Sequence, residues 1–284
     1  MPLIFTLKYF KDAQFVAEIA ALVVAMLVIR SLTSALLTHN QSSSIDSRPS
    51  PWMTPLAYAL GSWVVLPSYF RIHVTGQENV PRDGAVILAP THRSRWDALV
   101  VPYAAGRFAT GRDIRFMVTA DEVKGLQGWL IRHLGGFPVN PRQPAIASLR
   151  HGLEILQNRE MLVIFPEGGI FRDKQVHPLK PGLARLALQA EASQPDLTVQ
   201  VVPVYLDYSQ AFPTWGCKVN VRIGKPLQVA DYTQGKPKSE AQRLTADLTT
   251  ALKRLAGTET EVMETVNGAG ESMPVCLQHG QMHG

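Results

Sequence analysis

Cysteine is scarce in this sequence, which has only Cys217 and Cys276 among its 284 residues. Two cysteines exclude a framework of several disulfides, and their spacing is not that of a metal site. A reducing compartment is therefore the default expectation, and neither a metal ion nor a bound cofactor is predicted. The sequence also lacks a Gly-x-Ser-x-Gly segment, so the nucleophilic serine of an α/β-hydrolase is not expected.

Long membrane-spanning runs are missing at the N-terminus. The uncharged run Ile19–Ile29 is shorter than the roughly 20 residues that a transmembrane helix needs. Polar residues before it predict a longer amphipathic helix over residues 9–37, and no small-residue cleavage site follows that would mark a signal peptide. The segment 39–51 is polar, rich in serine and proline, and typical of a linker.

A second apolar segment, Trp52–Phe70, also carries no charge. Pro55, Gly61 and Pro67 disfavour a straight spanning helix, and the aromatic rings near its ends favour a lipid–water interface. A hairpin of core helices beneath the main domain is the alternative. We interpret residues 1–70 as a pair of membrane-associating helical segments, which predicts a lipid surface as a partner.

Basic residues outnumber acidic ones in the middle of the chain. Between residues 92 and 150 there are nine arginines and lysines against four aspartates and glutamates, a surplus equal to the net charge of +5 of the whole chain. This segment predicts an anionic partner, although a solvated positive face explains the same charges. A nucleic acid is disfavoured, because no platform of stacking aromatic residues accompanies the arginines.

Short β-rich runs alternate with helical patterns from residue 71 to residue 256. This alternation predicts an α/β fold with a central mixed sheet flanked by helices, in which functional residues gather in loops beyond the strand ends. Strands are expected near 71–75, 85–90, 114–119, 136–140, 161–166, 199–206 and 217–224, and helices near 96–105, 125–134, 144–158, 181–193 and 239–256. Periodicity then stops, so residues 257–284 are predicted to be a disordered tail.

The stretch THRSRWD, residues 91–97, follows the apolar run 85–90 and contains a His-x₄-Asp motif. On a straight helix His92 and Asp97 point about 140° apart, so they meet only if the chain turns between them. The carboxylate then holds one imidazole nitrogen and leaves the other to accept a proton, as a general base requires. An Asp that caps a helix near a surface His is the alternative.

A second polar stretch follows the apolar run at 161–165 and reads PEGGIFR. Its glycines let backbone amides approach an anion, and the basic residues at 172, 174 and 180 are suited to phosphate oxygens. Lys180-Pro181-Gly182 then opens a helix with free amide groups. Glu167 is an acid at the end of an apolar strand, a position that indicates a role in the site. The alternative is that Glu167 forms a turn and faces water.

Four blocks, THRSRWD, GGFPVNPR (135–142), FPEGGIFR (165–172) and VVPVYL (201–206), resemble in order and spacing the motifs of the glycerolipid acyltransferases. The resemblance covers about residues 70–230 and is greatest to the 1-acyl-sn-glycerol-3-phosphate acyltransferases. The two apolar segments before it resemble that family's membrane-dipping helical pair. The resemblance implies transfer of a fatty acyl group from an acyl thioester, acyl-ACP or acyl-CoA, to the sn-2 hydroxyl of lysophosphatidate. The product of this transfer is phosphatidic acid.

The resemblance also implies roles for single residues. His92 matches the base that deprotonates the acceptor hydroxyl, and Asp97 matches the acid that orients it. Arg142 is implied to contact the acceptor's phosphate, and Pro203 to lie near the acyl donor. The other candidates for substrate binding, from the third block and the helix start that follows it, are Glu167, Gly168, Gly169, Arg172 and Lys180. Residues 71–256 would be the catalytic domain, on the cytoplasmic side of the membrane.

The sequence departs from the family pattern in three blocks. Thr91 stands where asparagine is usual, and we expect its hydroxyl to donate a hydrogen bond in the same way. The second block reads Pro-Val-Asn-Pro-Arg instead of Phe-Ile-Asp-Arg. In the third block Arg172 is displaced by two positions from the family's arginine. The sequence therefore does not identify the acceptor substrate.

Alternative acceptors are glycerol-3-phosphate, a lysophospholipid and a lysoglycolipid. A non-catalytic protein that binds anionic membranes is a further alternative, which the presence of both His92 and Asp97 disfavours.

Overall fold

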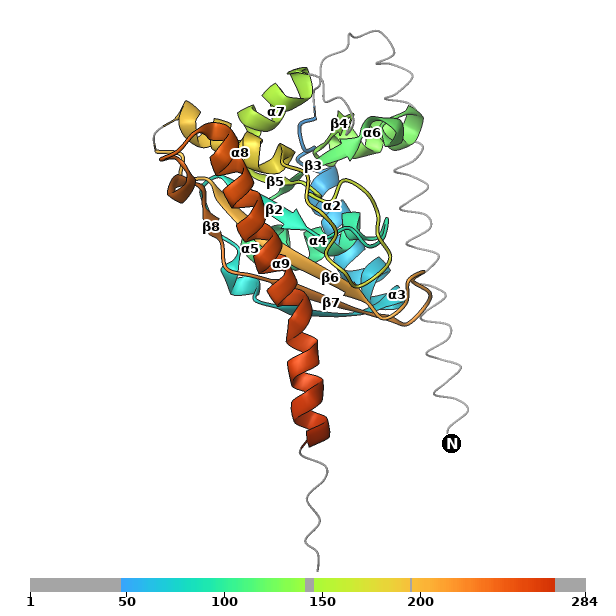
Figure 1. Cartoon of the computed structure of the whole chain (residues 1–284). Helices are drawn as coiled ribbons and strands as arrows, with labels where there is room; N and C mark the ends of the chain where they lie inside the picture. The colour runs from blue at the N-terminus through green and yellow to red at the C-terminus, as the bar shows by residue number, and fades with distance from the viewer. Residues whose placement is uncertain (1–46, 141–145, 195, 269–284) are drawn as a thin grey trace, which may run out of the picture.

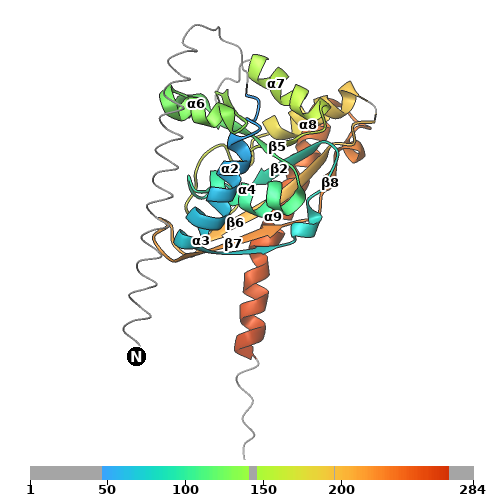
Figure 2. The ribbon, with the colours of Figure 1, turned by 180° about the vertical axis from the view of Figure 1, so that it is seen from behind.

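The computed structural model describes residues 47–140, 146–194 and 196–268 of the chain. In this part, eight strands form one sheet. Helices cover both faces of the sheet, as Figures 1 and 2 show from opposite sides. The strands are β1 (Phe70–Thr75), β2 (Val86–Pro90), β3 (Ile114–Thr119), β4 (Gly136–Val139), β5 (Met161–Val163), β6 (Gln200–Tyr208), β7 (Cys217–Ile223) and β8 (Leu227–Gln228).

The sheet is mixed, with strand order β1-β7-β6-β2-β5-β3-β4 and β8 beside β6. Strand β6 runs antiparallel to β7 and β8, whereas the other neighbouring pairs are parallel. Because β5, β2 and β6 are parallel neighbours, their carboxyl ends meet at one edge of the sheet. The loops that follow these three strands therefore lie close together.

The helices pack against the two faces of the sheet. The α-helices are α2 (Met53–Leu60), α3 (Leu66–Tyr69), α4 (Asp97–Ala105), α5 (Arg107–Thr110), α6 (Gly125–His133), α7 (Ile146–Gln157), α8 (Gly182–Ser193) and α9 (Pro237–Gly268). A π-helical turn, η1 (Gly61–Val65), joins α2 to α3, and the 3₁₀ turns are η2 (Gln77–Asn79), η3 (Ala120–Glu122) and η4 (Val229–Tyr232).

Strand β2 lies between two hydrophobic cores. All five of its residues are buried, as expected for a parallel strand that reads as a continuous apolar run. Ile87 and Ala89 pack in one cluster with residues of α7, α8 and α9, whereas Val86 and Leu88 pack in the other with residues of α3 and α4. Both cores therefore hold the end of β2, from which the first motif begins.

The structure confirms the predicted α/β fold with a central mixed sheet flanked by helices. The two-residue strand β8 and the four-residue helix α5 were not predicted, because elements this short show no periodicity. Helix α9 continues to Gly268, whereas the tail was predicted to begin at residue 257. The predicted boundary rested on apolar residues at helical spacing, which residues 257–261 lack, so the sequence pattern did not reveal the continuation.

The first predicted membrane-associating segment lies within residues 1–46, outside the described residues. The second forms α2, η1 and α3, with its α-helix changing to a π-helical turn at Gly61. Leu66 and Phe70 are buried in the domain's core, whereas the side chain of Trp63 is 70% exposed. This segment therefore packs on the α/β domain and also presents an aromatic ring to its surroundings. None of the helices in the described ranges is long and apolar enough to cross a bilayer.

Candidate active site

The first and third motifs meet at the carboxyl edge of the sheet. The first follows β2 and the third follows β5, and these two strands pair in parallel. The N–H of Phe171 donates to the carbonyl oxygen of His92 at 2.9 Å. The ring of Phe165 stacks on the imidazole of His92, with ring centroids 4.0 Å apart. Two stretches that are distant in sequence therefore form one site.

His92 and Asp97 are in contact across a turn of the chain. Nδ1 of His92 lies 2.8 Å from Oδ2 of Asp97, whose buried side chain belongs to the first residue of α4. The same oxygen accepts the N–H groups of Arg93 at 2.7 Å and Ser94 at 2.9 Å, so the turn wraps around the carboxylate. The other oxygen, Oδ1, accepts the hydroxyl of Tyr208 at 2.6 Å.

This arrangement gives the two imidazole nitrogens of His92 different roles. Nδ1 donates its proton to the carboxylate, so Nε2 is the basic nitrogen of the neutral ring. No group among the described residues hydrogen-bonds to Nε2, and the side chain is 21% exposed and lines a cavity. The geometry suits a base that accepts a proton from a hydroxyl bound in that cavity.

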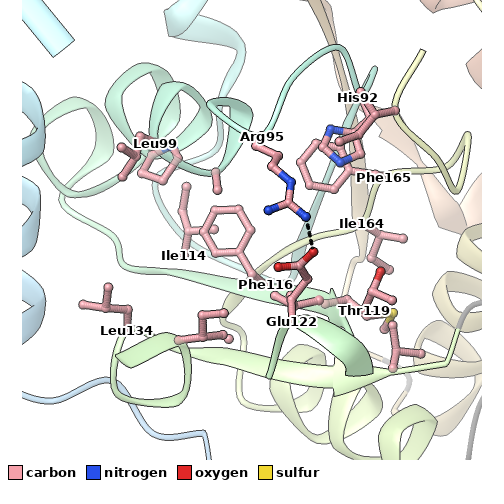
Figure 3. Close-up of a pocket in the computed structure, with 18 of the residues that line it drawn as sticks. His92, Arg95, Leu99, Ile114, Phe116, Thr119, Glu122, Leu134, Ile164 and Phe165 are labelled. Atoms are coloured by element: carbon pink, nitrogen blue, oxygen red, sulfur yellow. Dashed lines mark hydrogen bonds and ion pairs between the residues drawn. The ribbon is translucent and has the colours of Figure 1, made fainter. Parts of the chain in front are cut away.

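The cavity beside His92 has a volume of about 710 Å³, which is within the usual size of small-molecule sites. Its wall is mostly apolar and comes from α2, α4, β3, α6 and the third-motif loop. Figure 3 shows His92 and Phe165 at one end and Leu134 at the other. The ion pair between Arg95 and Glu122 lies between these ends, with the charged atoms 2.5 Å apart. The long apolar wall suits a hydrocarbon chain.

Gly168, Gly169 and Lys180 line the cavity together with His92. Gly168 has φ +71°, and a Cβ added there would lie 2.5 Å from Nζ of Lys180, so both the backbone conformation and the close approach favour glycine. The N–H of Lys180 donates to the carbonyl oxygen of Pro166 at 2.8 Å, which fixes its backbone beside the motif. No carboxylate within the described residues pairs with the Lys180 ammonium, which suits an anionic group bound near His92.

Glu167 is buried and does not line the cavity. Its side chain is 0% exposed, and Oε2 lies 2.8 Å from Nη1 of Arg93. The carboxylate also accepts the N–H groups of His92 at 2.8 Å and His177 at 3.1 Å. The acid that the sequence assigned to substrate binding therefore ties the first motif to the third and to the chain that follows it.

Two further predicted residues, Arg172 and Pro203, lie apart from the cavity wall. The guanidinium of Arg172 lies over the ring of Phe212, 4.6 Å from its centre. Pro203 is buried in β6, opposite Ala89 of β2. Neither Arg172 nor Pro203 lines the cavity, and Arg142 falls outside the described residues.

Thr91 is bonded to β6 through its backbone and its side chain. Its Oγ1 accepts the N–H of Leu206 at 3.0 Å, and its own N–H donates to the carbonyl oxygen of Val204 at 2.9 Å. Accepting this bond leaves the hydroxyl proton available, so the expected role of Thr91 as a donor stays a prediction. Thr91 fixes the start of the first motif against β6.

Sequence reasoning missed Arg93, Tyr208 and Tyr58. Tyr208 shares a face of β6 with Leu206, so extending the two-residue alternation beyond the fourth block points to it. Tyr58 lines the cavity, and burial, with the charge of Asp113, raises the pKa of its hydroxyl above its usual range. Within the described ranges, no three His, Cys, Asp or Glu side chains are grouped so as to hold a metal ion.

Residues 71–207 match the family model described as Acyltransferase. The 1-acyl-sn-glycerol-3-phosphate acyltransferase of Bacillus subtilis is 25% identical over 200 residues, which cover 68% of this chain and 92% of that protein. The protein of the same name from Streptococcus pneumoniae is 24% identical over 166 residues, so the match spans 56% of this chain and 56% of that relative. Residues 71–207 form a domain of the acyltransferase family, which confirms the family predicted from the four motifs.

A solved structure supports the fold of this domain. The 1-acyl-sn-glycerophosphate (LPA) acyltransferase PlsC from Thermotoga maritima superposes with a TM-score of 0.59. The superposition covers 86% of this chain and 92% of that chain, at 21% sequence identity. The shared features are thus the mixed sheet and its flanking helices.

Proposed function

We propose that this chain transfers a fatty acyl group from an acyl thioester to the sn-2 hydroxyl of 1-acyl-glycerol-3-phosphate, forming phosphatidic acid. The observation that carries the proposal is the contact between His92 and Asp97 at one end of an apolar cavity. The names of the relatives from Bacillus subtilis and Streptococcus pneumoniae support this choice of acceptor.

The reaction follows from the geometry at His92. Nε2 takes the proton of the acceptor hydroxyl while the oxygen attacks the thioester carbonyl carbon. A C–O bond forms, the C–S bond then breaks, and the imidazolium returns the proton to the departing thiolate. Asp97 holds Nδ1–H and stabilises the imidazolium between these steps. Because a thiolate leaves readily, the enzyme needs no covalent intermediate of its own.

The substrates have distinct places in this scheme. The acceptor's phosphate lies beside Lys180 and the glycines of the third motif, where charge and backbone amides favour an anion. A hydrocarbon chain extends along the apolar wall toward Leu134. The thioester is acyl-ACP or acyl-CoA, and the enzyme works at the cytoplasmic surface of a membrane. The exposed ring of Trp63 beside the domain supports contact with lipid.

The position of Arg172 keeps a second acceptor class open. Its guanidinium lies over Phe212 and not on the cavity wall, so the arginine that usually follows the Pro-Glu-Gly block has no direct equivalent at the cavity. The same chemistry on glycerol-3-phosphate, a lysophospholipid or a lysoglycolipid is the alternative function.

Acyl transfer by the purified full chain in detergent tests the proposal. Labelled acyl-CoA and acyl-ACP are each offered with lysophosphatidate and with the alternative acceptors, beside the variant His92→Ala. We expect turnover on lysophosphatidate that falls by about 10²–10⁴ in the variant. If the protein acylates only one of the other acceptors, the proposed mechanism stands and the proposed substrate is wrong. A variant as active as the wild type would contradict the role of His92.

A further inference from the structure

Tyr208 contacts Asp97 from a different part of the fold than the other partners of this carboxylate. His92, Arg93 and Ser94 belong to the turn that precedes α4, and all three bond to Oδ2. Tyr208 is the last residue of β6, and its hydroxyl donates to Oδ1 at 2.6 Å. Within the described residues, Tyr208 is the partner that links the aspartate to the sheet.

The tyrosine is held in place by its surroundings. Its side chain is 8% exposed, and its ring packs edge-to-face on Phe70 with centroids 6.2 Å apart. Phe70 in turn packs on Trp96, the residue before Asp97, with centroids 5.1 Å apart. Burial, with the charge of Asp97 and the hydrogen bond to it, raises the pKa of the Tyr208 hydroxyl far above its usual range. The hydroxyl therefore stays protonated and remains a donor.

We propose that Tyr208 is a positioning residue for the acyl transfer, because its hydroxyl holds Asp97 with Oδ2 directed at Nδ1 of His92. The proposal rests on the proposed function of His92 as the base. Tyr208 does not line the cavity, so it acts through the aspartate and does not touch the substrate.

Removing the hydroxyl leaves Oδ1 of Asp97 without its partner from β6, so the carboxylate can turn away from Nδ1 of His92. The loss is expected in kcat, because the groups that line the cavity are unchanged and only the alignment of the base is altered.

The other charged and titratable groups near His92 and Asp97 are unchanged when the Tyr208 hydroxyl is removed. Glu167 lies beside the backbone of His92 and is paired with Arg93. Lys180 and Arg95 line the cavity with His92, and the Arg95 side chain is paired with Glu122. Cys217 adjoins Tyr208 and is buried.

Tyr208→Phe tests the proposal, since phenylalanine keeps the ring that packs on Phe70 and removes only the hydroxyl. Tyr232→Phe is the control, because Tyr232 packs in the other hydrophobic core and its hydroxyl donates to a carboxylate far from the site, that of Asp247, at 2.8 Å. The measurements are kcat and KM for both substrates, and the NMR signal of the His92 Nδ1 proton in protein labelled at histidine. Thermal unfolding of each variant reports its folding.

We expect Tyr208→Phe to lower kcat about tenfold with little change in KM, because a carboxylate that has lost one buried hydrogen bond holds the imidazole less well in line with the acceptor hydroxyl. The NMR signal of the His92 Nδ1 proton shifts or broadens in this variant, and Tyr232→Phe changes neither kcat nor that signal. A folded Tyr208→Phe variant with the wild-type kcat and the wild-type Nδ1 proton signal would overturn the proposal. This NMR signal reports on Tyr208 even if lysophosphatidate is not the acceptor, so failure of the proposed function remains distinguishable.

Discussion

Arg93 and Glu167 form an ion pair that is buried between the first and third motifs. Nη1 of Arg93 lies 2.8 Å from Oε2 of Glu167, and the two side chains are 4% and 0% exposed. Nη2 of Arg93 also donates to the carbonyl oxygen of Gln175 at 2.7 Å. The pair thus joins the loops after β2 and β5, and it places His92 beside the glycines of the third motif.

Breaking this ion pair from one side is expected to destabilise the fold. Arg93→Met leaves the Glu167 carboxylate buried without its cation, which costs about 3–5 kcal/mol in the free energy of unfolding. The double variant Arg93→Met with Glu167→Gln is expected to lose less, because no uncompensated charge remains. Denaturant unfolding followed by circular dichroism measures both.

Arg95→Met is the matched control for that experiment. Its ion pair with Glu122 is exposed, with side chains 76% and 36% accessible, so its loss changes stability by less than about 1 kcal/mol. Equal losses for the Arg93 and Arg95 variants would show that the buried pair has no special part in holding the motifs together.

Asp97→Asn is expected to lower kcat by about 10²–10⁴-fold while the protein stays folded. The carboxylate accepts the N–H groups of Arg93 and Ser94 and the proton of His92 Nδ1, and an amide has no charge with which to stabilise the imidazolium. Steady-state acyl transfer, with circular dichroism as the check of folding, measures the effect. Wild-type turnover in this variant would mean that His92 works without Asp97.

Gly168→Ala is expected to impair both stability and acceptor binding. A residue with a Cβ at φ +71° costs about 1–2 kcal/mol, and the new atom meets Nζ of Lys180. Gly182→Ala is the control, since nothing lies within 4 Å of a Cβ there and the residue begins α8. Thermal unfolding and KM for the acceptor separate the two variants, and similar behaviour would contradict the assigned role of Gly168.

Lys180→Gln and Arg172→Gln distinguish the two basic residues proposed to bind the acceptor. Lys180 lines the cavity and Arg172 does not, so loss of Lys180 is expected to raise KM for a phosphate-bearing acceptor roughly 10- to 100-fold, the effect of one charge-assisted hydrogen bond. Arg172→Gln is expected to change KM little. The reverse order would place the acceptor's phosphate near Phe212.

Leu134→Phe is expected to shift donor preference toward shorter acyl chains. Leu134 lines the cavity at the end opposite His92, and a larger side chain there fills space that a hydrocarbon chain would use. Competition among acyl donors of increasing chain length measures the preference. Leu130→Phe is the control, because Leu130 lies in α6, about one turn before Leu134, but is not part of the cavity wall and is 44% exposed. If Leu134→Phe leaves the chain-length preference unchanged, the acyl chain of the donor does not bind at the Leu134 end of the cavity.

The sequence by itself determined the fold class and most element positions, and it singled out His92 and Asp97 as a pair that a turn would bring into contact. These features follow from local patterns: alternation of apolar residues along strands, helical spacing, and a turn short enough to bring position 92 back to position 97. The family was also readable, because its motifs are continuous stretches of sequence.

Only the tertiary structure decided which side chains of those motifs face the cavity. Glu167 and Arg172 are five residues apart in one motif, yet one is buried against Arg93 and the other lies over Phe212. Tyr208 and Asp97 are 111 residues apart in the sequence. They are in contact only because β6 pairs with β2 in the sheet. Such partners are set by the pairing of distant strands and by the packing of two cores, and no local periodicity records them.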